Sequence, residues 1–312
     1  MQPDAVGRVA IVGAGAVGGY YGGRLSEAGE EVSFLVRSGL ATWRRDGLQV
    51  ESPAGSFHIR EPRVFEAAGE IGPVDLVVVA WKATSNEYYE EVIAPLLHEK
   101  TTILTLQNGL GNTEQLAALF GAERILGGLC FVCINRVRMA CIRHLAKGLV
   151  TIGEHDSGLE GNARLKETVS LFQRAEIECR AVEDLVHAQW VKLVWNVPFN
   201  GLCIARGGIN TKELLGQPGG EEDVRLLMGE VISAAAALGK QVDSGVIEQQ
   251  VGATREMGAY RPSSMIDYLE GCAVEVEAIW AEPLRRAEAA GARLPHWKQL
   301  LADIRMRLAE RS

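Results

Sequence analysis

Three polar side chains recur every four residues within an otherwise apolar stretch near the middle of the chain. The stretch HAQWVKLVWNVPFNGLCIA, residues 187–205, carries Lys192, Asn196 and Asn200. On an α-helix a step of four residues returns to nearly the same face, so these side chains are predicted to form one polar row. An ammonium group and two amides in this arrangement can polarise a carbonyl group, protonate its oxygen and orient its substituents.

The alternative for Lys192 is a solvated lysine whose aliphatic stem packs on apolar neighbours. That alternative predicts further charges nearby, yet the stretch contains no other Lys, Arg, Asp or Glu. A buried ammonium needs a partner or a lowered pKa. Because the reference pKa of lysine is about 10.4, partial desolvation would make Lys192 a better acid near neutrality. Pro198 removes a helical N–H group and is expected to bend the helix.

A glycine-rich turn near the N-terminus has the layout of a dinucleotide-binding loop. It follows the apolar run RVAIV and opens a stretch with helical periodicity. In such loops the first glycine permits a tight turn, the second lets the backbone approach a pyrophosphate, and the third allows close helix–strand packing. N–H groups at the start of the helix then bind the phosphates. The predicted cofactor-binding residues here are Gly13, Ala14, Gly15, Ala16, Val17 and Gly18.

The end of the second predicted strand indicates which nucleotide binds. Enzymes that use NAD often carry Asp or Glu there for the ribose hydroxyls, whereas this chain reads FLVRSG with Arg37. A guanidinium suits a 2′-phosphate, so NADP(H) is the predicted cofactor. The alternative is an ordinary surface arginine. Two further strand ends carry Lys82 and Asn108, which are either solvated loop residues or part of a shared crevice at the carboxyl ends of the strands.

The cysteines offer a superficial metal pattern. Cys130, Cys133, Cys141 and His144 have the spacing C-x2-C-x7-C-x2-H, but GGLCFVCINRV is a continuous apolar run. A buried strand with small apolar thiols explains that run better than a zinc site, and the loop between the half-sites is short. We expect no metal.

The distribution of patterns predicts an α/β fold with two domains. Up to about residue 180, Val- and Ile-rich runs alternate with helical stretches such as SNEYYEEVIAPLLHEK, which favours a Rossmann-type parallel sheet covered on both faces. GLQVESPAGSFHIREPRV suggests a hairpin insertion. After that point helical periodicity dominates. We therefore predict a dinucleotide-binding domain at 1–180 and an all-α substrate domain at 181–312.

Composition limits the classes of partner. The chain has 312 residues, 47% of them hydrophobic, and a formal net charge of −8, which argues against general nucleic-acid binding. No apolar run reaches transmembrane length and MQPDAVGRVAIVGAG lacks the layout of a signal peptide, so we expect a cytoplasmic protein that does not bind membranes. The small-residue run VISAAAALG leaves open whether it packs a homodimer or the core of one chain.

Read in order, these motifs resemble ketopantoate reductase (2-dehydropantoate 2-reductase) over nearly the whole chain. The matching pieces are GAGAVG, WKA with Lys82, LQNGLGN with Asn108, RHLAKGLVTIGE, WVKLVWNVPFN, Asn210, RPSSMID and Glu275. The resemblance implies a Rossmann domain followed by a helical domain resembling the C-terminal domain of 6-phosphogluconate dehydrogenase, with the active site in the cleft between them.

The resemblance also implies roles for individual residues. Lys192 would donate the proton when NADPH reduces 2-dehydropantoate to pantoate, a step toward pantothenate and coenzyme A. The implied substrate-binding residues are Asn108, Asn196, Asn200, Asn210 and Ser264, while Asn108 is shared with the cofactor, and Lys82 and Glu275 lie on the cofactor side. Ser263 or Ser264 has an alternative role as a helix cap, and Glu275 and Glu277 have one as a solvated helix face.

Three departures from the family pattern bear on the substrate. SSMID is one residue shorter than the usual motif, Arg261 stands where a substrate-binding Asn can occur, and Trp280-Ala281 replaces Asn-Gly. An extra guanidinium and an extra indole near the pocket would change its charge and size. The alternatives to ketopantoate reduction are therefore reduction of another 2-oxo acid, or a sensor that binds NADP(H) without turnover.

Overall fold

The computed structural model describes residues 7–156 and 163–311. Residues 1–6, which begin the stretch judged to lack a signal peptide, lie outside the described residues. The chain forms two compact units, called here the sheet unit and the helical unit. The sheet unit comprises Met1–Gln107 and Asn112–Leu185, and the helical unit comprises Asn108–Gly111 and Val186–Ser312.

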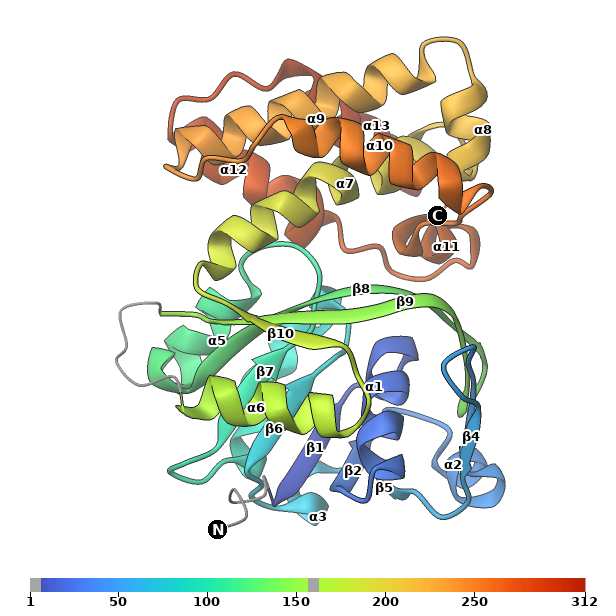
Figure 1. Ribbon diagram of the computed structural model, residues 1–312, viewed down its shortest axis with the longest axis vertical. Coiled ribbons are helices and arrows are strands. Elements are labelled where there is room, and N and C mark those ends of the chain that lie inside the picture. Colours follow the sequence, from blue (N-terminus) through green and yellow to red (C-terminus); the bar gives the residue numbers. More distant parts are fainter. Residues whose placement is uncertain (1–6, 157–162, 312) are drawn as a thin grey trace. The chain divides into compact units, whose positions relative to one another are not determined.

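In the described part of the sheet unit, ten strands form one mixed sheet in the order β4-β3-β9-β8-β7-β6-β1-β2-β5, with β10 beside β9 (Figure 1). Neighbours from β5 to β8 are parallel, β9 is antiparallel to β8, and β4 is antiparallel to β3. The strands are β1 Arg8–Val12, β2 Glu31–Leu35, β3 Leu48–Glu51, β4 Phe57–Ile59, β5 Arg63–Phe65, β6 Leu76–Val79, β7 Thr102–Thr105, β8 Ile125–Arg138, β9 Cys141–Glu154 and β10 Cys179–Val182.

Strand β1 is apolar from Val9 to Val12 because its side chains point alternately into two buried clusters. Val9 and Ile11 of β1 belong to one buried cluster, whereas Ala10 and Val12 belong to another. Successive side chains of a strand point to opposite faces, so both faces of the sheet are covered. The predicted Rossmann-type α/β fold is confirmed, and so is the β3–β4 hairpin.

The helices of the sheet unit are short, apart from α1 and α6. The stretch 85–100, expected to be helical, is divided into three short pieces, and Pro95 lies at the start of the third. The helices are α1 Ala16–Glu27, α2 Leu40–Asp46, α3 Ala68–Ile71, η1 Ala83–Tyr88, α4 Tyr89–Ile93, η2 Ala94–Leu96, α5 Asn112–Phe120, η3 Ala122–Arg124 and α6 Ala163–Arg174.

Helix α1 is packed against strands on two sides, and its glycines make this possible. A Cβ atom at Gly22 would lie 2.7 Å from side-chain atoms of Ile11 on β1, and one at Gly19 would lie 3.1 Å from Ile142 on β9. The run GGYYGG thus removes side chains from both faces of the helix. Figure 1 shows the long arm formed by β8 and β9 extending past α1 toward β4. We did not predict β9 as a strand or this arm.

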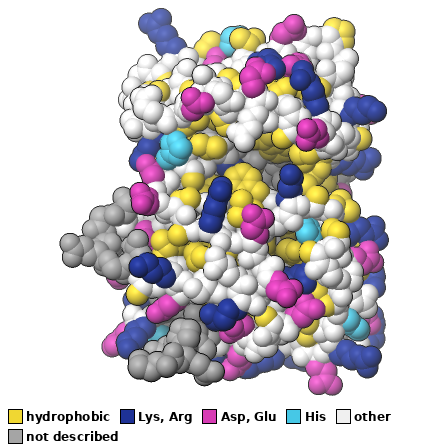
Figure 2. All heavy atoms as spheres, viewed as in Figure 1, with side chains coloured by type: hydrophobic (Ala, Val, Ile, Leu, Met, Phe, Trp, Pro, Cys, Tyr) yellow, Lys and Arg dark blue, Asp and Glu magenta, His cyan; other side chains and the backbone are white. Residues whose placement is uncertain are grey.

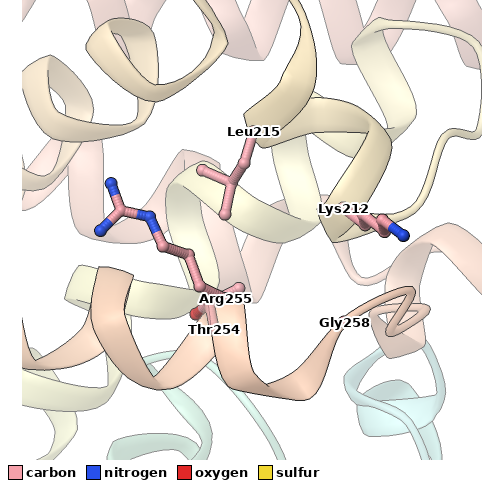
Figure 3. A pocket seen from close by; sticks show the side chains of 5 residues that line it. All are labelled: Lys212, Leu215, Thr254, Arg255 and Gly258. Atoms are coloured by element: carbon pink, nitrogen blue, oxygen red, sulfur yellow. The ribbon is translucent and has the colours of Figure 1, made fainter.

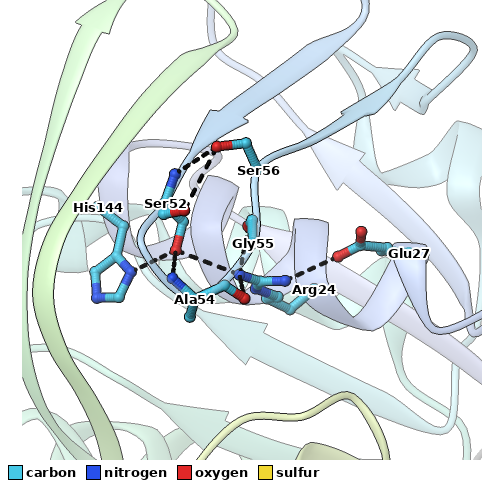
Figure 4. Close-up of polar contacts among 7 residues, drawn as sticks. All are labelled: Arg24, Glu27, Ser52, Ala54, Gly55, Ser56 and His144. Atoms are coloured by element: carbon cyan, nitrogen blue, oxygen red, sulfur yellow. Dashed lines mark hydrogen bonds and ion pairs between the residues drawn. The ribbon is translucent and has the colours of Figure 1, made fainter.

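A buried polar network holds the β3–β4 turn against α1 (Figure 4). Arg24 of α1, 5% exposed, donates to the carbonyl oxygens of Ala54 and Gly55 at 3.0 and 2.8 Å. The Nε2 atom of His144 donates to the Lys147 carbonyl oxygen at 2.9 Å, and its Nδ1 atom lies 2.8 Å from the Ser52 hydroxyl oxygen. Both ring nitrogens of His144 are therefore engaged within the protein.

The helical unit is built around one long central helix. Val194 and Val197 of α7 are fully buried in its core, and the Val231, Ala234 and Ala235 face of α9 packs into the same core. The helices are α7 Leu185–Ala205, α8 Thr211–Gly216, α9 Gly220–Ala237, α10 Gly245–Met257, α11 Ser263–Leu269, η4 Glu277–Ala281, α12 Glu282–Ala289 and α13 Pro295–Arg311. Helix α7 continues through Pro198, and the bend predicted there stays a prediction.

Acidic and basic side chains are interspersed on the face of the molecule drawn in Figure 2, rather than gathered in one basic patch. Within residues 7–156 and 163–311, no helix combines the length and the apolar character needed to cross a membrane.

Candidate active site

The three polar residues of α7 are buried, as their apolar surroundings predict. Lys192, Asn196 and Asn200 are 9%, 7% and 3% exposed. The Lys192 ammonium donates a hydrogen bond of 2.8 Å to the side-chain oxygen of Asn108, which belongs to the same helical unit. This bond offsets part of the desolvation cost of the ammonium group and fixes its position.

Asn108 reaches α7 because the next two residues pack on the π-helix η4. Gly109 has φ +83°, and a Cβ atom there would lie 2.1 Å from the carbonyl oxygen of Ala278. The N–H group of Leu110 donates to that same oxygen at 2.9 Å. Any residue other than glycine at 109 would be strained and would clash, so the glycine of the QNG motif determines where Asn108 lies.

The sequence of η4 explains why the carbonyl of Ala278 is free to accept this bond. The N–H group of Glu282 donates to the backbone carbonyl oxygen of Glu277, and this spacing of five residues is the π-helical pattern. In that register the donor for Ala278 would be residue 283, but Pro283 has no N–H group. Leu110 fills this gap, so the Glu-Pro pair contributes to the position of Asn108.

Asn200 connects the polar row to α11. Its side-chain oxygen accepts a hydrogen bond of 3.0 Å from the backbone N–H of Ser264, one of the unpaired donors at the start of that helix. Ser264 is 1% exposed, whereas Ser263 is exposed. The expectation that one of these serines caps the helix is wrong, because Pro262 occupies the cap position and Asn200 supplies the oxygen.

The remaining predicted residues of the helical unit differ in their surroundings. Glu275 is buried, whereas Glu277 is exposed and forms an ion pair with Arg305 at 3.0 Å, so the solvated-face alternative describes Glu277 and not Glu275. Asn210 caps α8, and its oxygen accepts from the N–H of Glu213 at 3.0 Å. That capping role would have been predictable from the sequence NTKE, which is a capping box.

An aromatic group lies beside the polar row, and the sequence analysis missed it. The ring of Trp195 stacks on Phe199 with centroids 5.1 Å apart and is tilted against Tyr260 at 6.1 Å. Its indole N–H donates to the Thr254 hydroxyl at 2.9 Å. Trp195 follows Lys192 by three residues, which places it on the same side of the helix. From that spacing, the position of Trp195 beside the polar row could have been predicted.

Trp280, one of the departures from the family pattern, is packed inside the helical unit. Its side chain is fully buried, and the indole N–H donates to the carbonyl of Val197 at 2.9 Å. Trp280 therefore links η4 to α7. Arg261 is exposed, and it directly follows Tyr260 in the segment that packs on Trp195.

A separate pocket of about 260 Å³ lies between α8 and α10 (Figure 3). Thr254, which accepts from Trp195, lies at its base, but none of the predicted site residues lines it. Arg255 at its edge forms an ion pair with Glu221 at 2.5 Å. The lining residues are Lys212, Leu215, Thr254, Arg255 and Gly258.

In the sheet unit, the glycine-rich loop has the geometry that a dinucleotide requires. Gly13 has φ +96°, and a Cβ atom there would lie 2.5 Å from the backbone nitrogen of Trp81. In front of Gly15 there is open space, where a Cβ atom would meet nothing within 4 Å. A Cβ atom at Gly18 would lie 2.3 Å from the Gly13 carbonyl oxygen. The residues present therefore fit a pyrophosphate at the start of α1.

Two predicted cations lie at the ends of strands in this unit. Arg37 follows β2, is exposed, and forms no ion pair with any described residue. Lys82 follows Trp81, whose backbone contacts Gly13, so it lies close to the glycine-rich loop. Among the described residues, Arg37 and Lys82 form no hydrogen bond with each other.

Four of the six cysteines are buried, whereas Cys130 is partly buried and Cys272 is exposed. Burial raises the pKa of the Cys179 and Cys203 thiols to about 12 in each case, so neither is a thiolate at neutral pH. Cys133 and Cys141 are buried in the β8–β9 arm. Among the described residues, no group of three or more His, Cys, Asp or Glu side chains is arranged to hold a metal ion.

The glycine loop, the two-sided sheet and the buried lysine–amide row define an oxidoreductase that uses a nicotinamide nucleotide. The model for "Ketopantoate reductase PanE/ApbA" matches residues 9–157, and that for "Ketopantoate reductase PanE/ApbA C terminal" matches residues 184–307. The chain belongs to this family, as the resemblance predicted. It is an NADP-dependent oxidoreductase.

Individual relatives extend over almost the whole chain. A 2-dehydropantoate 2-reductase of Nostoc sp. is 38% identical over 92% of this chain and 91% of its own length. The crystal structure of 2-dehydropantoate 2-reductase from Geobacter metallireducens is 42% identical, with a TM-score of 0.93, and the match covers 96% of this chain and 99% of that one. A D-mandelate dehydrogenase structure is 22% identical with a TM-score of 0.88, and the match covers 97% of this chain and 98% of that one. It shows the same fold.

Proposed function

We propose that the chain reduces 2-dehydropantoate to pantoate with NADPH, a step toward pantothenate and coenzyme A, and that Lys192 donates the proton. The observation that carries this proposal is the buried hydrogen bond of 2.8 Å between the Lys192 ammonium and Asn108. It places an acid with a defined orientation in a family that includes relatives named 2-dehydropantoate 2-reductase.

The proposed reaction needs one hydride from NADPH and one proton from an acid group of the protein. When bound, NADPH supplies the hydride that C2 of the oxo acid accepts. Lys192 holds its ammonium toward the C2 oxygen and transfers one proton to it, which leaves a neutral amine that water reprotonates. A positioned acid typically contributes about 10² to 10⁴ in rate.

The neighbouring polar groups are proposed to orient the substrate. Asn196 has a buried amide one helical turn from Lys192, and Asn200 fixes Ser264 at the start of α11. We assign substrate contacts to Asn108, Asn196, Asn200, Asn210 and Ser264, and cofactor contacts to residues 13–18, Arg37, Lys82, Asn108 and Glu275.

Arg37 provides a test of the cofactor preference. Arg37→Ala is expected to lower the affinity for NADP⁺ about 10- to 100-fold, because it removes a charge-assisted bond to the 2′-phosphate, and to leave NAD⁺ affinity nearly unchanged. Titration calorimetry with both nucleotides measures this. Arg60→Ala, an exposed arginine of the same unit, is the matched control. An unchanged ratio of the two affinities in Arg37→Ala would remove the assignment.

A panel of 2-oxo acids, each assayed with NADPH and with NADH, tests substrate and cofactor together. We expect 2-dehydropantoate with NADPH to give the highest kcat/KM. If another oxo acid is turned over far faster, the chain is a family member with a different substrate, and Arg261 and Trp195 become the first residues to exchange. If NADPH binds but no oxo acid oxidises it, the sensor alternative replaces the reductase.

Several expectations about the whole protein remain proposals. We assign the cofactor to residues 1–180 and the substrate to residues 181–312, and we retain the cytoplasmic location and the absence of nucleic-acid partners as predictions. Part of the VISAAAALG run lies in the core of the helical unit. Ser233, Ala236 and Ala237 of the same run are exposed, so a homodimer through this run stays a proposal, which sedimentation equilibrium would test.

A further inference from the structure

We propose that Arg136, on the arm formed by β8 and β9, supplies a second guanidinium to the phosphate groups of the bound dinucleotide. The proposal deepens the NADP(H) binding proposed above and rests on it. Nothing in the sequence motifs singles out Arg136, because it lies about 100 residues after Arg37 and outside the glycine-rich loop.

The arm extends into the region where α/β sheets bind their ligands. Strand β8 is parallel to β7, and their last paired residues are Gly127 and Thr105. Beyond Gly127, β8 continues to Arg138, whereas β7 has ended. The second half of β8 therefore lies past the carboxyl ends of the parallel strands, which is where open α/β sheets bind nucleotides.

The strand pairing determines which face of the arm carries Arg136. Arg136 is paired with Ile142, and directly opposed residues of an antiparallel pair project to the same face. Ile142 contacts the first turn of α1, since a Cβ atom at Gly19 would lie 3.1 Å from it. The ring of His144, two residues further on, packs on Tyr20 of α1 with centroids 4.6 Å apart. Arg136 thus projects on the side of the arm that faces the start of α1.

The tip of the arm contacts the loop that carries the other predicted phosphate ligand. Gly39, two residues after Arg37, lies against Met139, and a Cβ atom at Gly39 would be 2.8 Å from that side chain. The N–H group of Gln49 donates to the Ala140 carbonyl at 2.9 Å, which holds the tip in place. Arg136 is therefore situated between the first turn of α1 and the loop of Arg37.

The arginines near the tip of the arm differ in whether they have a partner within the protein. Arg138 donates to the side chain of Gln49 at 2.7 Å, and Arg143, on the opposite face, forms an ion pair with Glu51 at 2.7 Å. Arg136 is exposed and has no such partner among residues 7–156 and 163–311, as is also true of Arg37. Two guanidinium groups that lie near an anion-binding helix start, and that have no ion pair within the described residues, suit a ligand with several phosphates.

The test compares Arg136→Gln with wild type by titration calorimetry on the full chain. The probes are NADP⁺, NAD⁺ and adenosine 2′,5′-bisphosphate, which has the 2′-phosphate but no pyrophosphate. We expect NADP⁺ affinity to fall about tenfold in Arg136→Gln and to recover in part in Arg136→Lys. Arg143→Gln, on the other face of the same arm, is the matched control and should bind NADP⁺ like wild type.

The probes also locate the contact. A loss shared by NADP⁺ and the bisphosphate, with NAD⁺ unaffected, assigns Arg136 to the 2′-phosphate, and a loss shared by NADP⁺ and NAD⁺ assigns it to the pyrophosphate. Unchanged NADP⁺ affinity in Arg136→Gln, or an equal loss in Arg143→Gln, overturns the proposal. Wild type that binds no nucleotide would instead overturn the proposed function, so the two failures are distinguishable.

Discussion

Replacing Lys192 with alanine is expected to lower kcat for 2-dehydropantoate about 10²- to 10⁴-fold, because the substitution removes the proposed proton donor. NADPH affinity should change little, since the nucleotide is proposed to bind mainly through the glycine-rich loop and Arg37. Steady-state kinetics and nucleotide titration on the same preparation measure the two effects.

Two further variants make the Lys192 result specific. Lys192→Met keeps the aliphatic stem and should be as slow as Lys192→Ala, which separates lost packing from the lost proton. Lys212→Ala removes an exposed lysine of the same unit and should behave like wild type. Near-normal turnover in Lys192→Met would show that another group protonates the substrate.

Gly109→Ala is expected to lower turnover about 10²-fold or more, although residue 109 offers no functional group. The backbone there has φ +83°, and the new Cβ atom would lie 2.1 Å from the Ala278 carbonyl oxygen. The segment must move to relieve this contact, which displaces Asn108 from Lys192. A misplacement of about 1 Å in a catalytic site can cost about 10² in rate.

The matched control for Gly109→Ala is Gly207→Ala. Gly207 has φ +89° in the same unit, but a Cβ atom there would meet nothing within 4 Å. Both variants carry backbone strain of order 1–3 kcal/mol, so both should lose some thermal stability. If Gly207→Ala lost as much turnover as Gly109→Ala, general strain and not the position of Asn108 would explain the effect.

Local patterns in the sequence predicted the parts of the fold and site that depend on near neighbours. The glycine spacing at residues 13–18 specified a turn, an open approach and a close packing contact, and each is found at the expected position. The four-residue spacing of Lys192, Asn196 and Asn200 predicted one buried helix face, and all three are buried. Both inferences need only the geometry of one helix or one turn.

The features that sequence reasoning missed depend on contacts between distant segments. That Asn108 belongs to the helical unit follows from Gly109 and Leu110 packing on Ala278, about 170 residues later. The bond from Trp280 to the Val197 carbonyl was not predicted, because a departure from the family motif does not reveal what an indole contacts. The β8–β9 arm was missed because its bulges interrupt the alternation that would mark a strand.

The central claim is that the chain transfers a hydride from NADPH to C2 of 2-dehydropantoate. The most direct measurement uses NADPH that carries deuterium on the reactive face of C4, with mass spectrometry of the product. With two preparations deuterated on opposite faces of C4, we predict that one gives pantoate with one deuterium at C2 for each NADPH oxidised and that the other gives unlabelled pantoate. Pantoate that carries no deuterium from either preparation, or no pantoate at all, would contradict the claim.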